Sequence, residues 1–354
     1  MSKFWNKTTT SLEPYVPGEQ PKDKKYIKLN TNENPYPPSP QALKAMQEAV
    51  NGDLRLYPDP TCSDLRETIA GYYGLTSDQV FVGNGSDEIL ALAFQGFFSP
   101  DKPIVFPDIT YSFYPVYAKL YGLRYELVPL DDQFEVPIER LCQPNGGVIL
   151  PNPNAPTAKY MPLGGIRAIL ERNTEHVVLI DEAYIDFGGE TAAALINDYP
   201  NLLVVQTLSK SRSLAGLRVG MALGNRELIE GLDRVKNSFN SYPLDRVALA
   251  GAAAAIKDDS YFKETTQKVI STRDAVVLKL RKSGFHVAES KANFIFISHA
   301  SKPAEEIFLA LREKAILVRY FNKPRINNFL RVTIGTDAEM EEFVRAISEI
   351  VGEA

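Results

Sequence analysis

The chain has 354 residues, of which 44% are hydrophobic and 23% charged, a balance typical of a water-soluble globular protein. Its formal net charge of -5 disfavours a nucleic-acid partner, and no apolar run approaches the roughly 20 residues of a membrane helix. The N-terminus lacks the apolar core of a secretion signal, so we expect a cytoplasmic protein with no membrane partner. Two distant cysteines and three scattered histidines predict reduced thiols and no metal site.

The elements predicted up to about residue 240 alternate between helix and strand. Helices are expected at 41–50, 63–73, 86–98, 166–172 and 226–239. Strands are expected at 79–82, 103–106, 124–128, 147–150, 177–180, 202–206 and 218–223. Several strands are continuous apolar runs, which suits burial on both faces, and Ser63 or Asp64 would cap the second helix. The alternation predicts an α/β fold with a mostly parallel, seven-stranded sheet flanked by helices.

The pattern changes after about residue 242 and predicts a smaller α+β unit. Its helices are expected at 246–256, 261–282, 304–314 and 338–351. Its strands are expected at 285–288, 294–297, 317–320 and 330–334. A chain of this length exceeds one compact core, so we predict two domains. The large one spans 40–243, and the small one combines 1–39 with 244–354.

A glycine turn follows the first predicted strand, in a region where open α/β sheets bind ligands. Gly83-Asn84-Gly85 leads into a helix that starts with Ser86 and Asp87. The free N–H groups and positive dipole end of such a helix can hold a phosphate. The glycine spacing is not that of the dinucleotide pattern. Taken alone, the segment is better explained as an ordinary capped helix after a turn.

Two further strand ends carry charged side chains. Asp181 directly follows an apolar strand, where a partly desolvated carboxylate needs a cationic partner, and Tyr184 lies three residues on. A structural ion pair or a helix cap explains Asp181 equally well. Lys210 follows another apolar strand, beside Ser209 and eight residues before Arg218. A lysine that forms a Schiff base must reach a pocket and lose its proton, and an arginine can bind phosphate through two hydrogen bonds.

Together these segments resemble the fold-type I pyridoxal-phosphate (PLP)-dependent aminotransferases, and within them the histidinol-phosphate aminotransferase branch. The resemblance runs over nearly the whole chain. Its motifs are Leu29-Asn30-Thr31-Asn32-Glu33-Asn34-Pro35, Arg55-Leu56-Tyr57-Pro58-Asp59, the glycine turn with Ser86-Asp87-Glu88, Asn152-Pro153-Asn154-Ala155-Pro156-Thr157, Asp181-Glu182-Ala183-Tyr184, Ser209-Lys210 with Ala215-Gly216-Leu217-Arg218, and Leu330-Arg331-Val332-Thr333-Ile334-Gly335. The resemblance implies transfer of an amino group between L-histidinol phosphate and 2-oxoglutarate, in histidine biosynthesis.

The family's residue roles map onto matching positions of this chain. Lys210 would carry PLP covalently and move a proton, Asp181 would pair with the ring nitrogen, and Tyr184 would donate to the ring's phenolic oxygen. The resemblance further implies a phosphate site of Ser86, Asp87, Ser209 and Arg218, and a ring stacked on Tyr111. Substrate contacts would come from Arg331, Arg319 and Tyr15. Tyr57 matches a residue that reaches the neighbouring subunit's phosphate, which implies a homodimer.

One departure from the family pattern affects the ring oxygen. The family usually has a second asparagine where this chain has Ala155, and glycine where it has Ala158. Either Asn154 takes over the contact with the ring oxygen or Tyr184 works alone, and we favour Asn154. The loss of one neutral hydrogen bond, roughly 0.5–1.5 kcal/mol, is too small to abolish the chemistry.

Three other functions remain open at this point. An aromatic-amino-acid aminotransferase would share the cofactor site, and the 17 tyrosines and 18 phenylalanines do not separate the two. A PLP-dependent threonine-phosphate decarboxylase would also need a phosphate pocket, but would release carbon dioxide and need no oxo-acid. A PLP-sensing regulator would carry an N-terminal DNA-binding domain. Only about thirty residues precede the region of resemblance, and the chain's net charge is negative, so this function is disfavoured.

Overall fold

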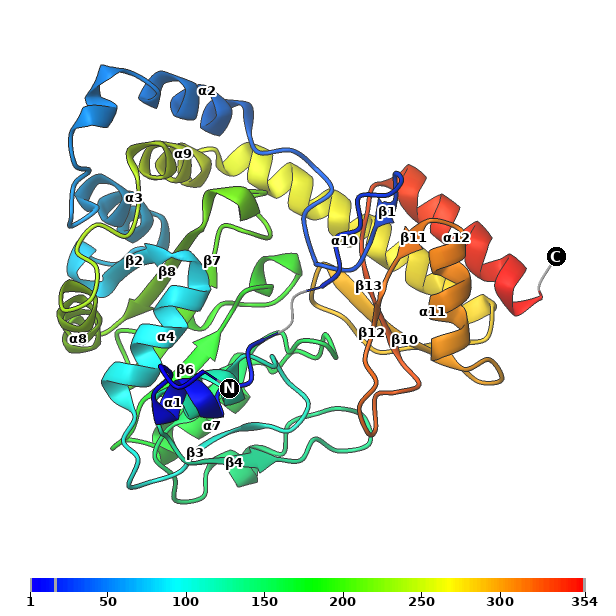
Figure 1. The fold of residues 1–354 in the computed structure, drawn as a ribbon, viewed down its shortest axis with the longest axis horizontal. Helices are drawn as coiled ribbons and strands as arrows, with labels where there is room; N and C mark the ends of the chain where they lie inside the picture. Colours follow the sequence, from blue (N-terminus) through cyan, green and yellow to red (C-terminus); the bar gives the residue numbers. More distant parts are fainter. Residues whose placement is uncertain (1, 16–17, 353–354) are drawn as a thin grey trace.

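The computed structural model describes residues 2–15 and 18–352 as two units joined by a long helix (Figure 1). The larger unit is built on a seven-stranded sheet with the order β2-β8-β7-β6-β5-β3-β4. Its strands are β2 (Val80–Asn84), β3 (Ile104–Pro107), β4 (Tyr125–Val128), β5 (Val148–Pro151), β6 (Val178–Asp181), β7 (Leu202–Thr207) and β8 (Val219–Gly224). Strand β8 runs antiparallel to both neighbours, and the other pairs are parallel.

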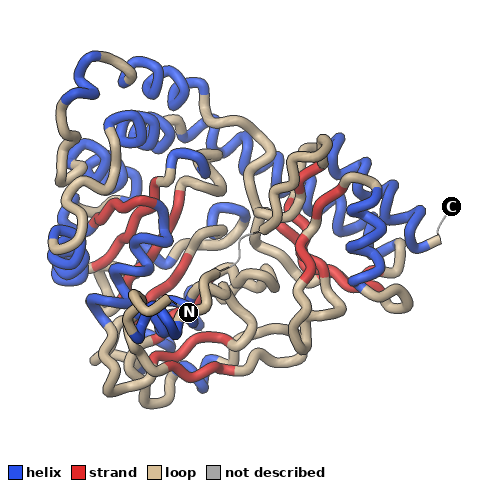
Figure 2. Tube along the Cα trace, viewed as in Figure 1, coloured by secondary structure: helices blue, strands red, loops and turns tan. Residues whose placement is uncertain are grey.

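Helices cover both faces of this sheet (Figure 2). They are α2 (Pro40–Ala49), α3 (Ser63–Tyr73), α4 (Gly85–Phe97), α5 (Tyr114–Leu120), α6 (Ile138–Leu141), α7 (Leu163–Arg172), α8 (Arg226–Asn237) and α9 (Arg246–Lys257). Neighbouring strand residues enter opposite cores: Val178 and Ile180 pack with α3, α7 and α9, whereas Leu179 packs with α4, α5 and α8. Burial on both faces explains the uniformly apolar strands.

The smaller unit is an antiparallel four-stranded sheet with the order β12-β13-β10-β9. Its strands are β9 (Phe285–Val287), β10 (Phe294–His299), β12 (Arg319–Tyr320) and β13 (Leu330–Thr333). Its helices are α11 (Ala304–Glu313), α12 (Asp337–Val351) and the long α10 (Asp259–Lys282), which reaches it from the larger unit (Figure 1). Strand β1 (Ile27–Lys28) pairs with β11 (Ile316–Leu317) and brings the N-terminal chain to this unit.

Most predicted elements are confirmed to within a few residues, but several features differ. The structure adds α1 (Lys7–Ser11), α5, α6 and β1, together with 3₁₀ helices at Gly52–Arg55, Ser77–Gln79, Ile185–Phe187, Ala192–Leu195 and Ala215–Leu217. The strand predicted at 317–320 is divided between β11 and β12. Neither Ser63 nor Asp64 caps α3, because Asp59 accepts the Ser63 N–H at 2.7 Å instead.

The predicted domain limits remain a prediction, but packing favours different ones. Helix α9 contacts α2 and α3, and its Ala248 and Ala252 belong to the core of the large sheet. Near the N-terminus, Glu13 pairs with Lys119 of α5 at 3.8 Å. We therefore propose that the small domain begins within α10 and that the chain around Glu13 packs on the large domain, whereas Glu19 pairs with Arg312 of α11. Within the described ranges, no helix has the length and apolar character needed to cross a membrane.

Candidate active site

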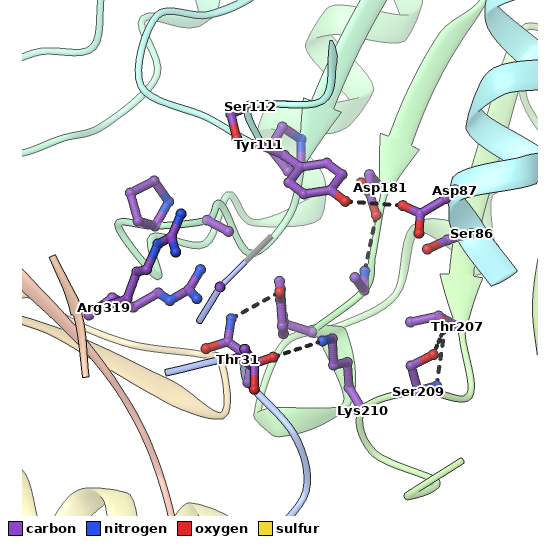
Figure 3. A pocket seen from close by; sticks show the side chains of 18 of the residues that line it. Thr31, Ser86, Asp87, Tyr111, Ser112, Asp181, Thr207, Ser209, Lys210 and Arg319 are labelled. Carbon is purple, nitrogen blue, oxygen red and sulfur yellow. Dashed lines mark hydrogen bonds between the residues drawn. The ribbon is translucent and has the colours of Figure 1, made fainter. Parts of the chain in front are cut away.

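A cavity of about 260 Å³ opens between the carboxyl ends of the large sheet's strands and the strands of the small unit (Figure 3). It brings together residues that are far apart in the sequence. The predicted site residues that line it are Tyr15, Ser86, Asp87, Tyr111, Asp181, Tyr184, Ser209, Lys210, Arg218, Arg319 and Arg331. This is the position at which open α/β sheets bind ligands, because strand ends there leave backbone and side chains free.

Lys210 lies in the turn after β7 and extends into the cavity. Its Nζ donates to the backbone oxygen of Thr31 at 3.4 Å (Figure 3). It also lies 5.7 Å from the ring centre of Tyr184. Asn34 holds the lysine's turn in place, because its Nδ2 donates to the Lys210 carbonyl at 3.0 Å. The amine therefore faces the cavity, held by weak contacts that a ligand can replace.

Asp181 ends β6 and is only 6% exposed. Tyr114 Oη donates to its Oδ2 at 2.7 Å, and the Ala183 N–H donates to its Oδ1 at 3.3 Å. Burial raises the pKa of the carboxyl to about 6, although both hydrogen bonds act in the opposite direction. No salt bridge satisfies it among the described residues, so the site fits a ligand with a protonated ring nitrogen.

The N-terminal end of α4 forms another wall of the cavity. Gly85 starts this helix with φ +76°, and Ser86 and Asp87 follow. A Cβ atom on Gly220 of β8 would lie 2.5 Å from the backbone nitrogen of Ser86, so this close approach requires glycine. The first N–H groups of a helix lack intrahelical partners and carry a partial positive charge, which suits an anion.

Three side chains complete this anion site. Arg218, with φ +56°, places its Nη2 3.2 Å from Asp87 Oδ2. Thr207 Oγ1 donates to Ser209 Oγ at 3.0 Å and accepts the Ser209 N–H at 3.1 Å (Figure 3). A guanidinium, hydroxyl groups and a helix N-terminus in one place fit the phosphate of PLP.

Aromatic side chains form the wall beside Asp87. Tyr111 Oη donates to Asp87 Oδ1 at 3.0 Å (Figure 3). Burial, and then the charge of Asp87, raises the pKa of Tyr111 far above its usual range, so the phenol stays neutral. Tyr15 stacks on Phe113 with ring centres 4.8 Å apart, and its ring lies 6.1 Å from that of Tyr111. The wall offers flat surfaces to a bound ring.

Two arginines face the cavity from the small sheet. Arg319 and Arg331 are paired residues of β12 and β13. Arg331 Nη2 donates to the Asn30 carbonyl at 2.9 Å, whereas its buried Nε has no hydrogen-bond partner among the described residues. Burial lowers the pKa of Arg331, and the charge of Arg319 lowers it further. Neither guanidinium forms a salt bridge with a described residue, so both are available to an anionic substrate group.

Two predicted site residues lie elsewhere. The contact expected of Asn154 is not supported: its Nδ2 donates to Ile109 O and Thr157 Oγ1, each at 2.9 Å, and its Oδ1 accepts from Thr110. Ala155, not Asn154, lines the cavity. Tyr57 lies outside the cavity and is 78% exposed.

Sequence reasoning missed three residues that structure brings to the site. Asn32 Nδ2 donates to Tyr184 Oη at 3.0 Å, Thr31 meets Lys210, and Tyr114 binds Asp181. The first two belong to the Asn-Thr-Asn-Glu-Asn-Pro motif, which the sequence singled out without a role. Nothing in the local pattern around Tyr114 pointed to the carboxyl 67 residues away.

Comparisons with known proteins agree with this geometry. The family model "Aminotransferase class I and II" matches residues 24–347. The histidinol-phosphate aminotransferase of Clostridium acetobutylicum is 62% identical over 351 residues, covering 99% of this chain and 100% of that protein. That of Clostridium beijerinckii is 60% identical over 351 residues, with 99% and 98% covered.

Solved structures share the fold. A histidinol-phosphate aminotransferase from Sinorhizobium meliloti, in complex with pyridoxal-5'-phosphate, has a TM-score of 0.89 at 24% identity, covering 99% of this chain and 98% of that one. An L-threonine-O-3-phosphate decarboxylase from Porphyromonas gingivalis has a TM-score of 0.80 at 20% identity, with 92% and 99% covered. The predicted fold class is thereby confirmed. With a family model over most of its length and full-length relatives at this identity, the chain belongs to the class I and II aminotransferases.

Proposed function

We propose that the protein transfers an amino group between L-histidinol phosphate and 2-oxoglutarate, with pyridoxal phosphate carried on Lys210. The observation that carries this proposal is the 62% identity to a histidinol-phosphate aminotransferase over the full chain. The cavity supports it, because a lysine, a buried carboxyl and an anion site surround one space, and Arg319 and Arg331, which form no salt bridge with a described residue, also line it. The solved PLP complex of a protein with this fold supports the cofactor.

Different side chains of the cavity would have different roles in the reaction. When bound, pyridoxal phosphate supplies a carbonyl group that takes up the amino group and a ring that accepts electrons. Asp181 would keep the ring nitrogen protonated, and Arg218, Ser209 and the first N–H groups of α4 would hold the phosphate. Lys210 Nζ would anchor the cofactor covalently. Once the substrate amine has displaced the Lys210 amine from the cofactor, the freed Lys210 amine would take a proton from the substrate's α-carbon.

The two substrates differ in the anion that they present, a phosphate in one and carboxylates in the other. A guanidinium fits both, because its planar fork of N–H groups donates two parallel hydrogen bonds to either anion. Arg331 is held at Nη2 by Asn30 and keeps its Nε unpaired. We therefore assign the anionic group of both substrates to Arg331, with Arg319 and Tyr15 beside it.

Arg331→Ala is expected to raise KM for both substrates about 10–100-fold, the effect of losing hydrogen bonds to a charged group. Arg331→Lys keeps the charge but not the fork, and should cause a smaller loss. Steady-state kinetics with each substrate varied in turn would measure this. A loss confined to one substrate would contradict the shared anion site.

The reaction itself is tested by mixing PLP-loaded protein with L-histidinol phosphate alone under single-turnover conditions. We expect the visible absorbance band to disappear and 2-oxoglutarate to restore it. A band that responds to aromatic amino acids but not to L-histidinol phosphate would replace the proposed substrate. Release of carbon dioxide from threonine phosphate without an oxo-acid would replace the reaction class.

We further propose a homodimer in which Tyr57 reaches the partner's phosphate site. Tyr57 stacks on Tyr242 with ring centres 4.7 Å apart, and Phe239 and Leu56 are exposed nearby in the chain. An exposed stacked aromatic pair with exposed apolar neighbours in the chain favours a protein interface. We also propose a cytoplasmic location, because the two free cysteines suit a reducing compartment. Burial raises the pKa of the Cys62 thiol to about 11, which keeps this thiol unreactive.

Hybrid dimers test this arrangement. Lys210→Ala and Tyr57→Ala proteins should each show little activity at limiting PLP, but a mixture allowed to exchange subunits should regain it. Each hybrid would contain one site with both residues intact. If subunits assort randomly, half of the dimers are hybrids, and up to about a quarter of all sites become active. A mixture no more active than the sum of its parts would contradict the shared site.

A further inference from the structure

We propose that Asn32 is a positioning residue, which fixes the hydroxyl of Tyr184 so that its proton remains available to the phenolic oxygen of pyridoxal phosphate. This inference rests on the proposed cofactor site and adds a residue to it. Asn32 does not touch the reacting atoms in this scheme. It acts through Tyr184, 152 residues away in the sequence, to which its Nδ2 donates at 3.0 Å.

The amide of Asn32 is held firmly in place. The residue is 1% exposed and adopts φ +57°, a left-handed conformation that asparagine tolerates better than most residues. Its backbone N–H donates to Thr333 Oγ1 at 3.0 Å, and Thr333 Oγ1 donates to its Oδ1 at 3.1 Å. Asn293 Nδ2 donates to its carbonyl at 3.0 Å. The neighbours therefore fix both the position and the orientation of this side chain.

The orientation determines the direction of the hydrogen bond to Tyr184. Because Thr333 occupies Oδ1, the Asn32 group that faces Tyr184 is the amide nitrogen, which only donates. Tyr184 Oη must accept, so its single proton is not used in this contact. Tyr184 Oη has no other hydrogen-bond partner among the described residues. The proton is thus free to be donated into the cavity, which Tyr184 lines.

The direction of the Asn32–Tyr184 hydrogen bond is important in this protein, because the second donor expected for the cofactor's ring oxygen is missing. Ala155 has no polar side-chain group, and Asn154 uses its amide on Ile109, Thr157 and Thr110. Tyr184 is then left as the donor to that oxygen. A loosely held phenol would donate to the ring oxygen only part of the time, so fixing its hydroxyl supports a contact that has no substitute.

The charged surroundings of Tyr184 do not depend on Asn32. Lys210 Nζ lies 5.7 Å from the tyrosine's ring centre, and Phe294 packs edge-on with ring centres 5.0 Å apart. Arg331 lines the same cavity as Tyr184. Because Asn32 is neutral, its replacement by a neutral residue changes hydrogen bonding without changing the charge around Tyr184.

Asn32→Gly is the sharpest test, because glycine adopts φ +57° without strain and removes the whole amide. Donation by Tyr184 stabilises negative charge on the ring oxygen and so weakens its hold on the proton shared with Lys210. The pH midpoint of the loaded protein's visible absorbance should therefore rise by roughly 0.4–1 unit in the variant. The dissociation constant for PLP should increase about 2–10-fold. Thr333→Val, which releases the amide but keeps the shape, should shift the midpoint in the same direction by less.

Two controls separate positioning from general destabilisation. In a Tyr184→Phe background, Asn32→Gly should no longer move the midpoint, because its effect passes through the hydroxyl. Asn173→Ala removes another buried amide, 5% exposed and bonded to the Leu141 and Ile169 carbonyls, and should lower stability without moving the midpoint. An unchanged midpoint in Asn32→Gly, or an equal shift without the tyrosine hydroxyl, would overturn the inference. A wild-type protein with no titrating band would overturn the proposed function as well.

Discussion

Lys210→Ala is expected to abolish amino transfer while leaving the fold intact. The amine acts twice in the proposed reaction, as the covalent anchor of the cofactor and as the group that moves the proton. General acid–base catalysis alone contributes up to about 10⁴-fold, so kcat should fall by at least that factor. The visible absorbance band should also be lost, although PLP still has the phosphate site available. Both readouts come from one spectrum and one rate assay.

The fold should survive this change because Lys210 contributes little to packing. Its Nζ makes one weak hydrogen bond, at 3.4 Å to Thr31 O, and the side chain borders a cavity. Thermal unfolding of the apoprotein should therefore match wild type closely. Lys102→Ala, a change outside the cavity beside His176, is a control that should leave both band and rate unaltered. A Lys210→Ala protein that still turns over at a normal rate would refute the assignment.

Sequence reasoning succeeded where a side chain's place follows from the strand before it. Asp181 ends β6, Lys210 lies in the turn that follows β7, and both strands were visible as apolar runs. Since carboxyl ends of neighbouring parallel strands meet at one edge of a sheet, the two residues were expected to be close. Strand periodicity and length set these positions, so local pattern was enough.

The orientation of the asparagine side-chain amides could not be predicted from the local sequence pattern. Asn154 was expected at the ring oxygen because it neighbours the missing asparagine, but its amide is drawn to the Ile109 carbonyl and the Thr157 hydroxyl. Asn32 meets Tyr184 only because β13 supplies Thr333 to fix it, 301 residues along the chain. Contacts of this kind depend on tertiary packing, which neither composition nor periodicity encodes.

Helix α5 was not predicted, and packing favours the large domain for α9, for different reasons. Tyr114 and Pro115 begin α5, and a short aromatic segment with proline has weak helical propensity that packing overrides. The alanine-rich α9 was expected in the small domain. Gly251 instead allows Met46 of α2 to approach, with 2.6 Å between a Cβ built there and Met46 Cγ. Small residues permit such close packing but do not indicate which partner they will meet.

Asp181→Asn is expected to have opposite effects on activity and on stability of the apoprotein. Without the carboxylate, the cofactor's ring nitrogen loses the partner that keeps it protonated. Loss of one such electrostatic contact in an active site costs roughly 10²–10³-fold in kcat. PLP should also bind more weakly. Single-turnover kinetics at saturating PLP would separate the effect on chemistry from the effect on binding.

The stability effect follows from the buried carboxyl. Its pKa rises from 3.8 to about 6 in the folded protein, so the folded state binds the proton more tightly than the unfolded state does. The stabilisation that this proton gives is complete below pH 3.8 and is lost as the pH rises through 6. The loss amounts to about 3 kcal/mol, from two pH units at about 1.4 kcal/mol each.

Asparagine has nearly the same shape but no charge to bury, so it escapes this penalty. It keeps the Tyr114 hydrogen bond and loses one contact, to the Ala183 N–H, worth about 1 kcal/mol. At pH 8 the apo variant should therefore be more stable than wild type by about 2 kcal/mol, and at pH 4 slightly less stable. Urea unfolding at both pH values measures the difference, and Asp198→Asn, an exposed carboxylate near Arg167, is the control. A variant equally destabilised at pH 4 and pH 8 would show that Asp181 is not poised for a cationic ligand.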